Sequence, residues 1–167
     1  ISGIPKIHDL ILENDSLILI EDYIHGQTLE QLLEKQTTLV YSDALAIMRK
    51  LCDVLKSLHA LTPPIIHRDL KLSNIILTSE NLVYIVDFDT ARYYESGQEQ
   101  DTELLGTKEY APPEQYGFGQ SDARSDIYAL GIIFNRLLTG EYPKHQLADD
   151  RYRSVISKCI RWNPEER

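Results

Sequence analysis

The sequence has little positive charge. Its 17 Lys and Arg residues are outnumbered by 26 Asp and Glu residues, which gives a formal net charge of −9 over 167 residues. A protein that neutralises nucleic-acid phosphates needs a basic surface. We therefore expect no nucleic-acid partner, whereas an acidic surface is compatible with a basic peptide.

Cysteine is also scarce, and long apolar runs are absent. Cys52 and Cys159 belong to no CxxC motif or Cys/His cluster, so we expect no zinc site. Both lie in apolar patterns of helical period, which indicates buried free thiols of a reducing compartment. No run of about 18 apolar residues occurs, so we expect no membrane-spanning segment. No signal peptide is visible either, and we expect a cytoplasmic protein.

Short strands are predicted near the start and the middle of the chain. Ile7–Glu13 and Leu17–Ile20 flank the turn-forming residues Asn14–Ser16, a pattern typical of a hairpin. Three further apolar segments have the length of short strands: Ile65–Ile66, Ile75–Leu77 and Leu82–Val86.

Apolar residues at helical spacing predict four helices: Thr28–Lys35, a longer helix from Ser42 to Pro63, Ile127–Leu138 and Tyr152–Trp162. Thr28 and Ser42 have side chains suited to capping the first two helices. Ile127–Leu138 is apolar on most faces, so it should be the buried central helix, with Gly140 ending it. Residues 90–110 lack apolar periodicity and are expected to form a surface loop.

The stretch Ile66-His67-Arg68-Asp69-Leu70-Lys71-Leu72-Ser73-Asn74 contains an acid, a lysine and an amide within six positions. Asp87, at the end of the predicted strand Leu82–Val86, could face the same cleft. Phosphoryl transfer needs a carboxylate to orient the attacking hydroxyl, a nearby cation and oxygen ligands for magnesium. This stretch is therefore either a site that handles phosphate and a metal ion or simply a polar turn between buried strands.

Three motifs decide between these readings. His67–Asn74 resembles the catalytic loop H-R-D-L-x-x-x-N of the eukaryotic-type protein kinases, Asp87–Asp89 resembles D-F-G, and Pro112–Glu114 resembles A-P-E. Lys71 and the pair Gly106-Thr107 are typical of the serine/threonine branch. Gly117–Gly131 resembles the bacterial, Hanks-type members.

The resemblance implies roles for individual residues. Asp69 would be the catalytic base and Lys71 the contact to the γ-phosphate of ATP. Asn74 and Asp87 would be the Mg²⁺ ligands. Backbone groups of Asp22 and Ile24, in a hinge segment, would hydrogen-bond the adenine of ATP. Ile76 would form the apolar floor under the adenine.

Further residues would support this machinery. Asp126 would hold the backbone of the catalytic loop, and Glu114 would pair with Arg167. His67 and Phe88 are expected to be packing residues. Arg68 beside Asp69 suggests activation by a phosphate, for which Thr102 is the candidate, while Thr107 would bridge the catalytic aspartate and lysine.

Two departures from the family pattern stand out. Asp89 replaces the glycine of D-F-G, so we expect a less flexible loop, because glycine tolerates backbone angles that a Cβ penalises. Glu21 falls where the family has an apolar or threonine side chain, and a buried carboxylate there would need a partner.

The resemblance predicts an α+β, protein-kinase-like fold that is only partial. Residues 1–24 would be the last strands of the N-terminal lobe and the hinge. Residues 25–167 would be the mainly helical C-terminal lobe, incomplete at its C-terminal end. Because the family's glycine-rich loop and strand lysine are missing and the chain begins without Met, we expect a piece of a longer protein that hardly catalyses alone.

The leading hypothesis is a protein serine/threonine kinase that uses ATP and Mg²⁺ on Ser/Thr hydroxyls of proteins, with self-association for autophosphorylation as one option. The alternative is a pseudokinase or kinase-like scaffold that binds protein partners. A small-molecule phosphotransferase of kinase-like fold is a third reading, but it would lack the segment from Gly106-Thr107 to Pro112–Glu114 that docks peptides.

Overall fold

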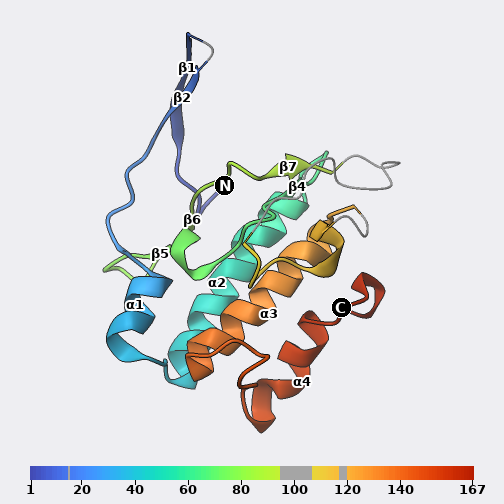
Figure 1. Ribbon diagram of the computed structural model, residues 1–167. Coiled ribbons are helices and arrows are strands. Elements are labelled where there is room, and N and C mark those ends of the chain that lie inside the picture. The colour runs from blue at the N-terminus through green and yellow to red at the C-terminus, as the bar shows by residue number, and fades with distance from the viewer. Residues whose placement is uncertain (15, 95–106, 117–119) are drawn as a thin grey trace.

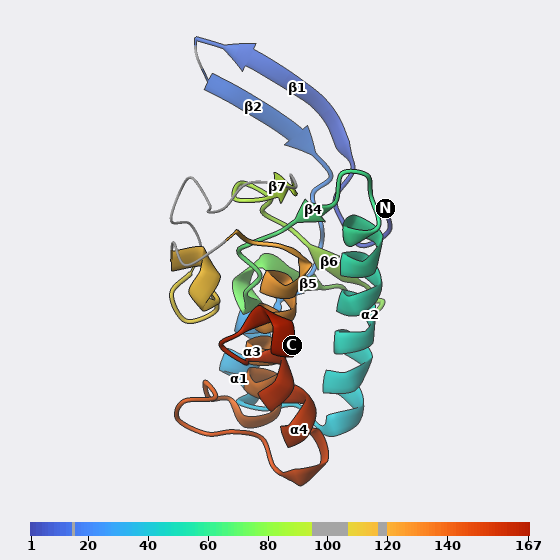
Figure 2. The same ribbon diagram turned by 90° about the vertical axis from the view of Figure 1, so that its right-hand side faces the viewer.

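The computed structural model describes residues 1–14, 16–94, 107–116 and 120–167. A body of helices carries small sheets at one end, and a hairpin projects from that end (Figures 1 and 2). The arrangement is consistent with the expected α+β, mainly helical architecture. None of the helices in this described part of the chain has the length and apolar character needed to cross a bilayer.

The predicted hairpin is confirmed. Strands β1 (Ile7–Glu13) and β2 (Ser16–Glu21) pair antiparallel, with Glu13 opposite Ser16 and Ile7 opposite Glu21. Every described residue of both strands is exposed, including the apolar ones, so the hairpin lies outside the core. Glu21 is exposed as well, which corrects the expectation of a buried carboxylate at this position.

Short strands frame the loop of interest. β3 (Gln27–Thr28), β5 (Ile75–Leu77) and β6 (Val83–Ile85) form one antiparallel sheet, while β4 (Ile65–Ile66) pairs with β7 (Arg92–Tyr93). The strand expected over Leu82–Val86 is thus one residue shorter at each end. β7 was not predicted, because it lies in a segment without apolar periodicity and exists through its pairing with β4.

All four predicted helices are present, at shifted bounds: α1 (Leu29–Gln36), α2 (Tyr41–His59), α3 (Ala123–Thr139) and α4 (Asp150–Cys159). Thr28 caps α1 as predicted, and Gln31 completes a capping box. The prediction for Ser42 is wrong: Val40 is the N-cap of α2, and the Ser42 hydroxyl bonds to Asp43 at 3.1 Å. Gly140 ends α3 in the left-handed conformation, at φ 76°.

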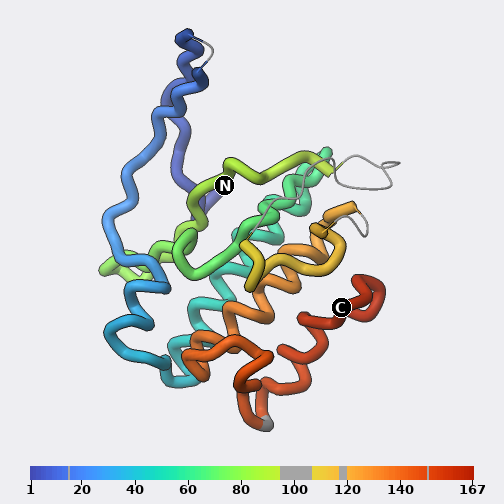
Figure 3. Tube along the Cα trace, viewed as in Figure 1, coloured from blue at the N-terminus to red at the C-terminus, as the bar shows by residue number. Residues whose placement is uncertain are grey.

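The core lies where α2 and α3 run side by side, with α1 and α4 packed around them (Figure 3). Its fully buried members include Leu51, Leu58, Ile133, Leu137 and Ile156. The expectation of buried thiols is wrong: Cys52 is exposed and Cys159 half-buried, although both are free. Cys52 belongs to the predicted apolar stripe but lies at its edge, where the core does not reach.

The start of the chain is tied to this core. The Ile85 N–H donates a 2.8 Å hydrogen bond to the carbonyl of Gly3, which connects the first residues to β6. Gly3 has φ 85°, and a Cβ there would lie 2.3 Å from Cγ2 of Val54 on α2. Only glycine fits this position. The hairpin is therefore anchored at the same end of the molecule as the loop after β4.

Candidate active site

The loop between β4 and β5 is buried and held by α3. Asp126, in the first turn of α3, accepts hydrogen bonds from the backbone N–H groups of His67 (3.1 Å) and Arg68 (3.0 Å). A carboxylate that satisfies consecutive backbone donors fixes the path of a loop. The predicted role of Asp126 is thereby confirmed. His59 also contacts this carboxylate, with Nε2 at 2.8 Å from Oδ2.

His67 is a packing residue, as predicted. Its ring is fully buried, lies edge-on to Phe88 with centroids 4.7 Å apart, and approaches the Val86 carbonyl at 3.3 Å. Burial lowers the pKa of His67, and the nearby Asp126 carboxylate only partly opposes this. The neutral imidazole is therefore favoured, which suits a residue that supports the loop and does not exchange protons.

Asp69 is the centre of a tight polar cluster. Lys71 Nζ lies 2.6 Å from Oδ2 of Asp69, and the Thr107 hydroxyl donates to Oδ1 at 2.7 Å. The Thr107 N–H also donates to Oδ1 at 2.9 Å, and Lys71 Nζ reaches the Thr107 hydroxyl at 3.2 Å. Both carboxylate oxygens are thus oriented, and Thr107 bridges the aspartate and lysine as predicted.

Asn74 joins Asp69 to Asp87. Its Nδ2 donates to the Asp69 carbonyl at 3.1 Å and to Oδ2 of Asp87 at 3.2 Å. The short 3₁₀ turn Leu72–Asn74 brings the amide into position, and the Val86 N–H donates to the Asn74 carbonyl at 2.9 Å. These contacts place the end of β6 beside the loop, so four predicted site residues form one hydrogen-bonded group.

The unusual backbone angle of the segment Asp87–Asp89 lies at its first residue. Asp87 is the residue in the left-handed region, at φ 65°, and Asp89 is not among the residues with positive φ. A side chain at position 89 therefore introduces no strain in this conformation. Both aspartates are exposed, so the Asp87 carboxylate is accessible from solvent.

The residues assigned to adenine lie apart from this cluster. The Asp22 N–H donates to the Lys6 carbonyl at 2.9 Å, and its carboxylate lies 2.6 Å from His8 Nε2. This contact with His8 is the main reason that the pKa of Asp22 is lowered. Ile24 and Ile76 are half-buried. Within the described residues, none of the three hydrogen-bonds to Asp69, Lys71, Asn74 or Asp87.

A cavity connects the hairpin with the cluster. Its volume is about 390 Å³, and it is lined by Glu21 and Leu19 of β2 together with Asp87 and Phe88. Glu21 is the first residue of the expected hinge, Glu21–Ile24. The cavity therefore joins the hairpin to Asp87, but its lining includes none of Asp22, Ile24, Ile76 and Asn74.

The segment Pro113–Tyr116 secures the far side of the site. Glu114 accepts hydrogen bonds from Nη1 (2.5 Å) and Nη2 (2.9 Å) of Arg167, which confirms that predicted pair, and also from the Ser125 hydroxyl at 3.0 Å. Gln115 Nε2 donates to the Arg68 carbonyl at 2.7 Å. No motif had suggested Gln115 or His59. The predicted phosphorylation site Thr102, the acidic run of residues 95–103 and Gly106 lie outside the described residues.

Comparison with known proteins agrees with this geometry. The family model described as "Protein kinase domain" matches residues 2–167. The chain is 32% identical over 168 residues to the serine/threonine-protein kinase PrkC of Bacillus subtilis, covering 97% of this chain and 26% of PrkC. It is 34% identical over 149 residues to the serine/threonine-protein kinase PknB of Mycobacterium tuberculosis, covering 87% of this chain and 23% of PknB.

The likeness extends beyond bacteria. A calmodulin-binding receptor-like cytoplasmic kinase of Arabidopsis thaliana is 35% identical over 166 residues, which cover 95% of this chain and 40% of that protein. The chain thus spans only about a quarter of the length of the bacterial relatives. The match over nearly every residue, together with the cluster around Asp69, shows that the chain belongs to the protein kinase domain family.

Proposed function

We propose that the protein containing this chain is a serine/threonine protein kinase of bacterial type, which transfers the γ-phosphoryl group of ATP to Ser or Thr hydroxyls of proteins. The observation that carries this proposal is the cluster in which Lys71 and Thr107 hold both oxygens of Asp69. A scaffold has no chemical need for an oriented carboxylate beside a cation. Names of relatives that contain "serine/threonine-protein kinase" support the same reaction.

Each residue of the cluster has a proposed task. Asp69 accepts the hydrogen bond of the attacking hydroxyl and takes its proton as the new bond forms. Lys71, whose ammonium lies 2.6 Å from that carboxylate, stabilises negative charge on the transferring group. Thr107 keeps the carboxylate from rotating, since its hydroxyl and its N–H bind the same oxygen.

The donor set fits magnesium. Among the described residues the Asn74 amide oxygen receives a single 3.4 Å contact, from Ser73, and the Asp87 carboxylate is exposed, so both can act as ligands. No group of three or more His, Cys, Asp or Glu that could hold a metal occurs in the described part of the chain. Mg²⁺ usually takes one or two protein carboxylates and completes its shell with water and phosphate, so Asp87 and Asn74 would be enough to hold it. When bound, the ion would neutralise the phosphate charge.

The proposal extends to the nucleotide, the substrate and the location. Backbone groups of Asp22 and Ile24 would bind adenine, with Ile76 as its floor. Substrates would be proteins with accessible Ser or Thr residues, and self-association would allow autophosphorylation. We propose action in the cytoplasm, because the reaction consumes ATP.

The test is transfer of labelled phosphate from ATP, with Mg²⁺, to a generic basic protein by the full-length protein and its Asp69→Asn variant. Asparagine keeps the size of the side chain but cannot take the proton. Transfer that disappears in the variant would support the proposal. Absence of transfer by the wild-type protein, with ATP still bound, would favour the pseudokinase alternative.

A further inference from the structure

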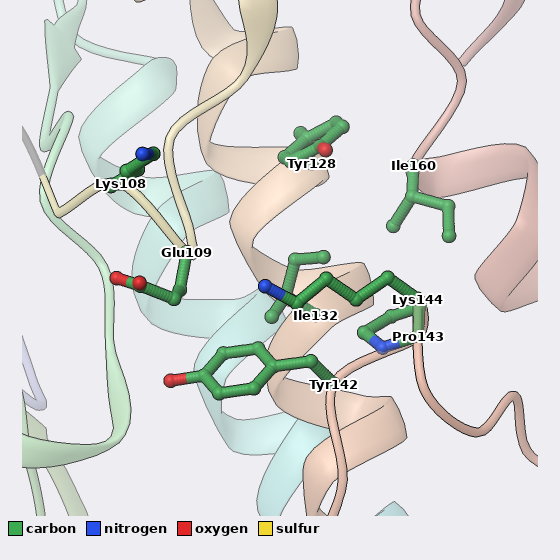
Figure 4. Close-up of a pocket in the computed structure, with 8 residues that line it drawn as sticks. All are labelled: Lys108, Glu109, Tyr128, Ile132, Tyr142, Pro143, Lys144 and Ile160. Carbon is green, nitrogen blue, oxygen red and sulfur yellow. The ribbon is translucent and has the colours of Figure 1, made fainter.

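A second cavity lies next to the proposed active site. Its volume is about 420 Å³, and its apolar walls include Tyr128 and Ile132 of α3 and Ile160 after α4 (Figure 4). Lys108, at its edge, directly follows Thr107, which binds Asp69. A side chain in this cavity would therefore belong to a segment that passes beside the proposed catalytic base.

Two lysines lie at the mouth of this cavity. Lys108 and Lys144 are exposed, and neither forms an ion pair with any residue that the structure describes. Figure 4 shows Lys144 extended over Ile132 toward Glu109. Glu109 is the one carboxylate among the residues that line the cavity, against two lysines. Positive charge therefore exceeds negative charge at this mouth, although the net charge of the chain is −9.

Arg136 adds a third cation behind Tyr142. Its guanidinium carbon lies 4.6 Å from the centroid of the Tyr142 ring, and Nη1 donates to the hydroxyls of Tyr110 (3.2 Å) and Tyr142 (3.0 Å). Both hydroxyl partners are neutral, and the buried Nε of Arg136 has no hydrogen-bond partner among the described residues. The charge of Arg136 therefore adds to that of the lysines around Tyr142.

Carboxylates near Arg136 fix where an acidic partner can lie. Glu30, Glu34 and Glu141 line a separate, smaller cavity of about 250 Å³ that Arg136 also borders. They would repel an acidic partner there. An acidic partner is therefore favoured only on the side of Lys108 and Lys144.

We propose that the cavity between Lys108, Ile132 and Lys144 docks an acidic segment of the protein substrate. An apolar side chain of that segment would fill the cavity, and neighbouring Asp or Glu side chains would accept hydrogen bonds from the ammonium groups of Lys108 and Lys144. This inference rests on the proposed kinase function, because it names the substrate class of the same site.

The test measures binding of labelled peptides by fluorescence anisotropy to the full-length protein, without ATP. One peptide carries Ser, a Leu and flanking Asp residues; a second has Lys in place of Asp, and a third has Ser in place of Leu. We expect the first to bind about five- to tenfold tighter than either other peptide, a size typical of a few exposed ion pairs and one buried apolar side chain. Raising the salt concentration should reduce the difference between the first two.

Charge reversal separates docking from general charge effects. Lys144→Glu should reverse the preference between the Asp and Lys peptides. Lys158→Glu, at an exposed position on α4, makes the same change in net charge and should leave the preference for the Asp peptide intact. Equal affinity for the Asp and Lys peptides, or equal losses in both variants, would overturn the proposal. If the protein transfers phosphate but binds both peptides equally, the kinase function is supported and the docking proposal is wrong. If it binds the Asp peptide selectively but transfers no phosphate, the docking surface is supported and the kinase function is not.

Discussion

The hydroxyl and the N–H of Thr107 both bind Oδ1 of Asp69, at 2.7 Å and 2.9 Å. The residues are 38 positions apart in the sequence, so this contact ties the segment that begins at residue 107 to the loop after β4. Lys71 occupies the other carboxylate oxygen. The orientation of the proposed base therefore depends on a residue outside its own loop.

Thr107→Ala should lower kcat, because it removes the hydroxyl and leaves the carboxylate freer to rotate. A hydrogen bond to a charged group contributes about 1.5–3 kcal/mol, so we expect a loss of roughly ten- to a hundredfold. Thr107→Ser keeps the hydroxyl and should stay within about threefold of the wild-type rate. Steady-state kinetics on the full-length protein would measure both. An alanine variant with unchanged kcat would show that Asp69 needs no such support.

The pair of Glu114 and Arg167 should be important for stability. The side chains are 6% and 0% exposed, and removing one partner leaves the other charge buried without compensation. Arg167→Met should therefore lower the free energy of unfolding by about 3–5 kcal/mol. The matched control is Arg161→Met, whose ion pair with Glu166 is exposed and should contribute less than about 1 kcal/mol. Urea denaturation would compare them, and similar losses would argue against a buried pair.

Local pattern was sufficient to predict the four helices and the loop between β4 and β5. Thr28 caps α1 because its side chain oxygen and Gln31 lie at the spacing of a capping box, which needs no distant contact. Asp69, Lys71 and Asn74 lie within one short loop, so their proximity follows from sequence distance. The Ser42 prediction failed because several adjacent residues could begin α2, and the Ser42 hydroxyl bonds to a neighbouring side chain instead.

Tertiary contacts were not predictable in the same way. His59 and Asp126 are 67 positions apart, and no spacing rule connects them. Cys52 lies at helical spacing from the buried residues Met48 and Leu55, yet it is exposed, because burial depends on which neighbour covers that edge of α2. β7 forms through pairing with β4 and has no pattern of its own. Glu21 is exposed because, among the described residues, nothing buries the hairpin.

Asp89→Gly should not stabilise the protein. Asp87, and not Asp89, has positive φ, so glycine at 89 relieves no strain and only increases the entropy of the unfolded chain. We expect a loss of about 0.4–1 kcal/mol by urea denaturation. Asn14→Gly is the matched control: Asn14 has φ 47° in the exposed β1–β2 turn, so glycine there should cause no loss. A gain in stability from Asp89→Gly would contradict the backbone conformation described above.

The stability of the protein should depend on pH through His67. Burial lowers the pKa of His67 in the folded state. In the unfolded chain the pKa of this histidine is about 6.5, so the unfolded chain binds the proton more readily. The contribution of neutral His67 to the free energy of unfolding is therefore fully present above that pH, and it is lost as the pH falls below it. His67→Phe keeps an aromatic ring but cannot titrate.

The free energy of unfolding of the wild-type protein and His67→Phe should be measured from pH 8 to pH 5. At pH 8 the variant should be less stable, since it lacks the 3.3 Å contact to the Val86 carbonyl. As the pH falls, the difference should shift in favour of the variant, by at most about 1.4 kcal/mol per pH unit. His145→Gln, at an exposed site, separates burial from the mere loss of a histidine. If the difference in unfolding free energy between the two proteins stays constant with pH, His67 binds protons equally well in the folded and unfolded states. That result would contradict the full burial of the ring beside Phe88.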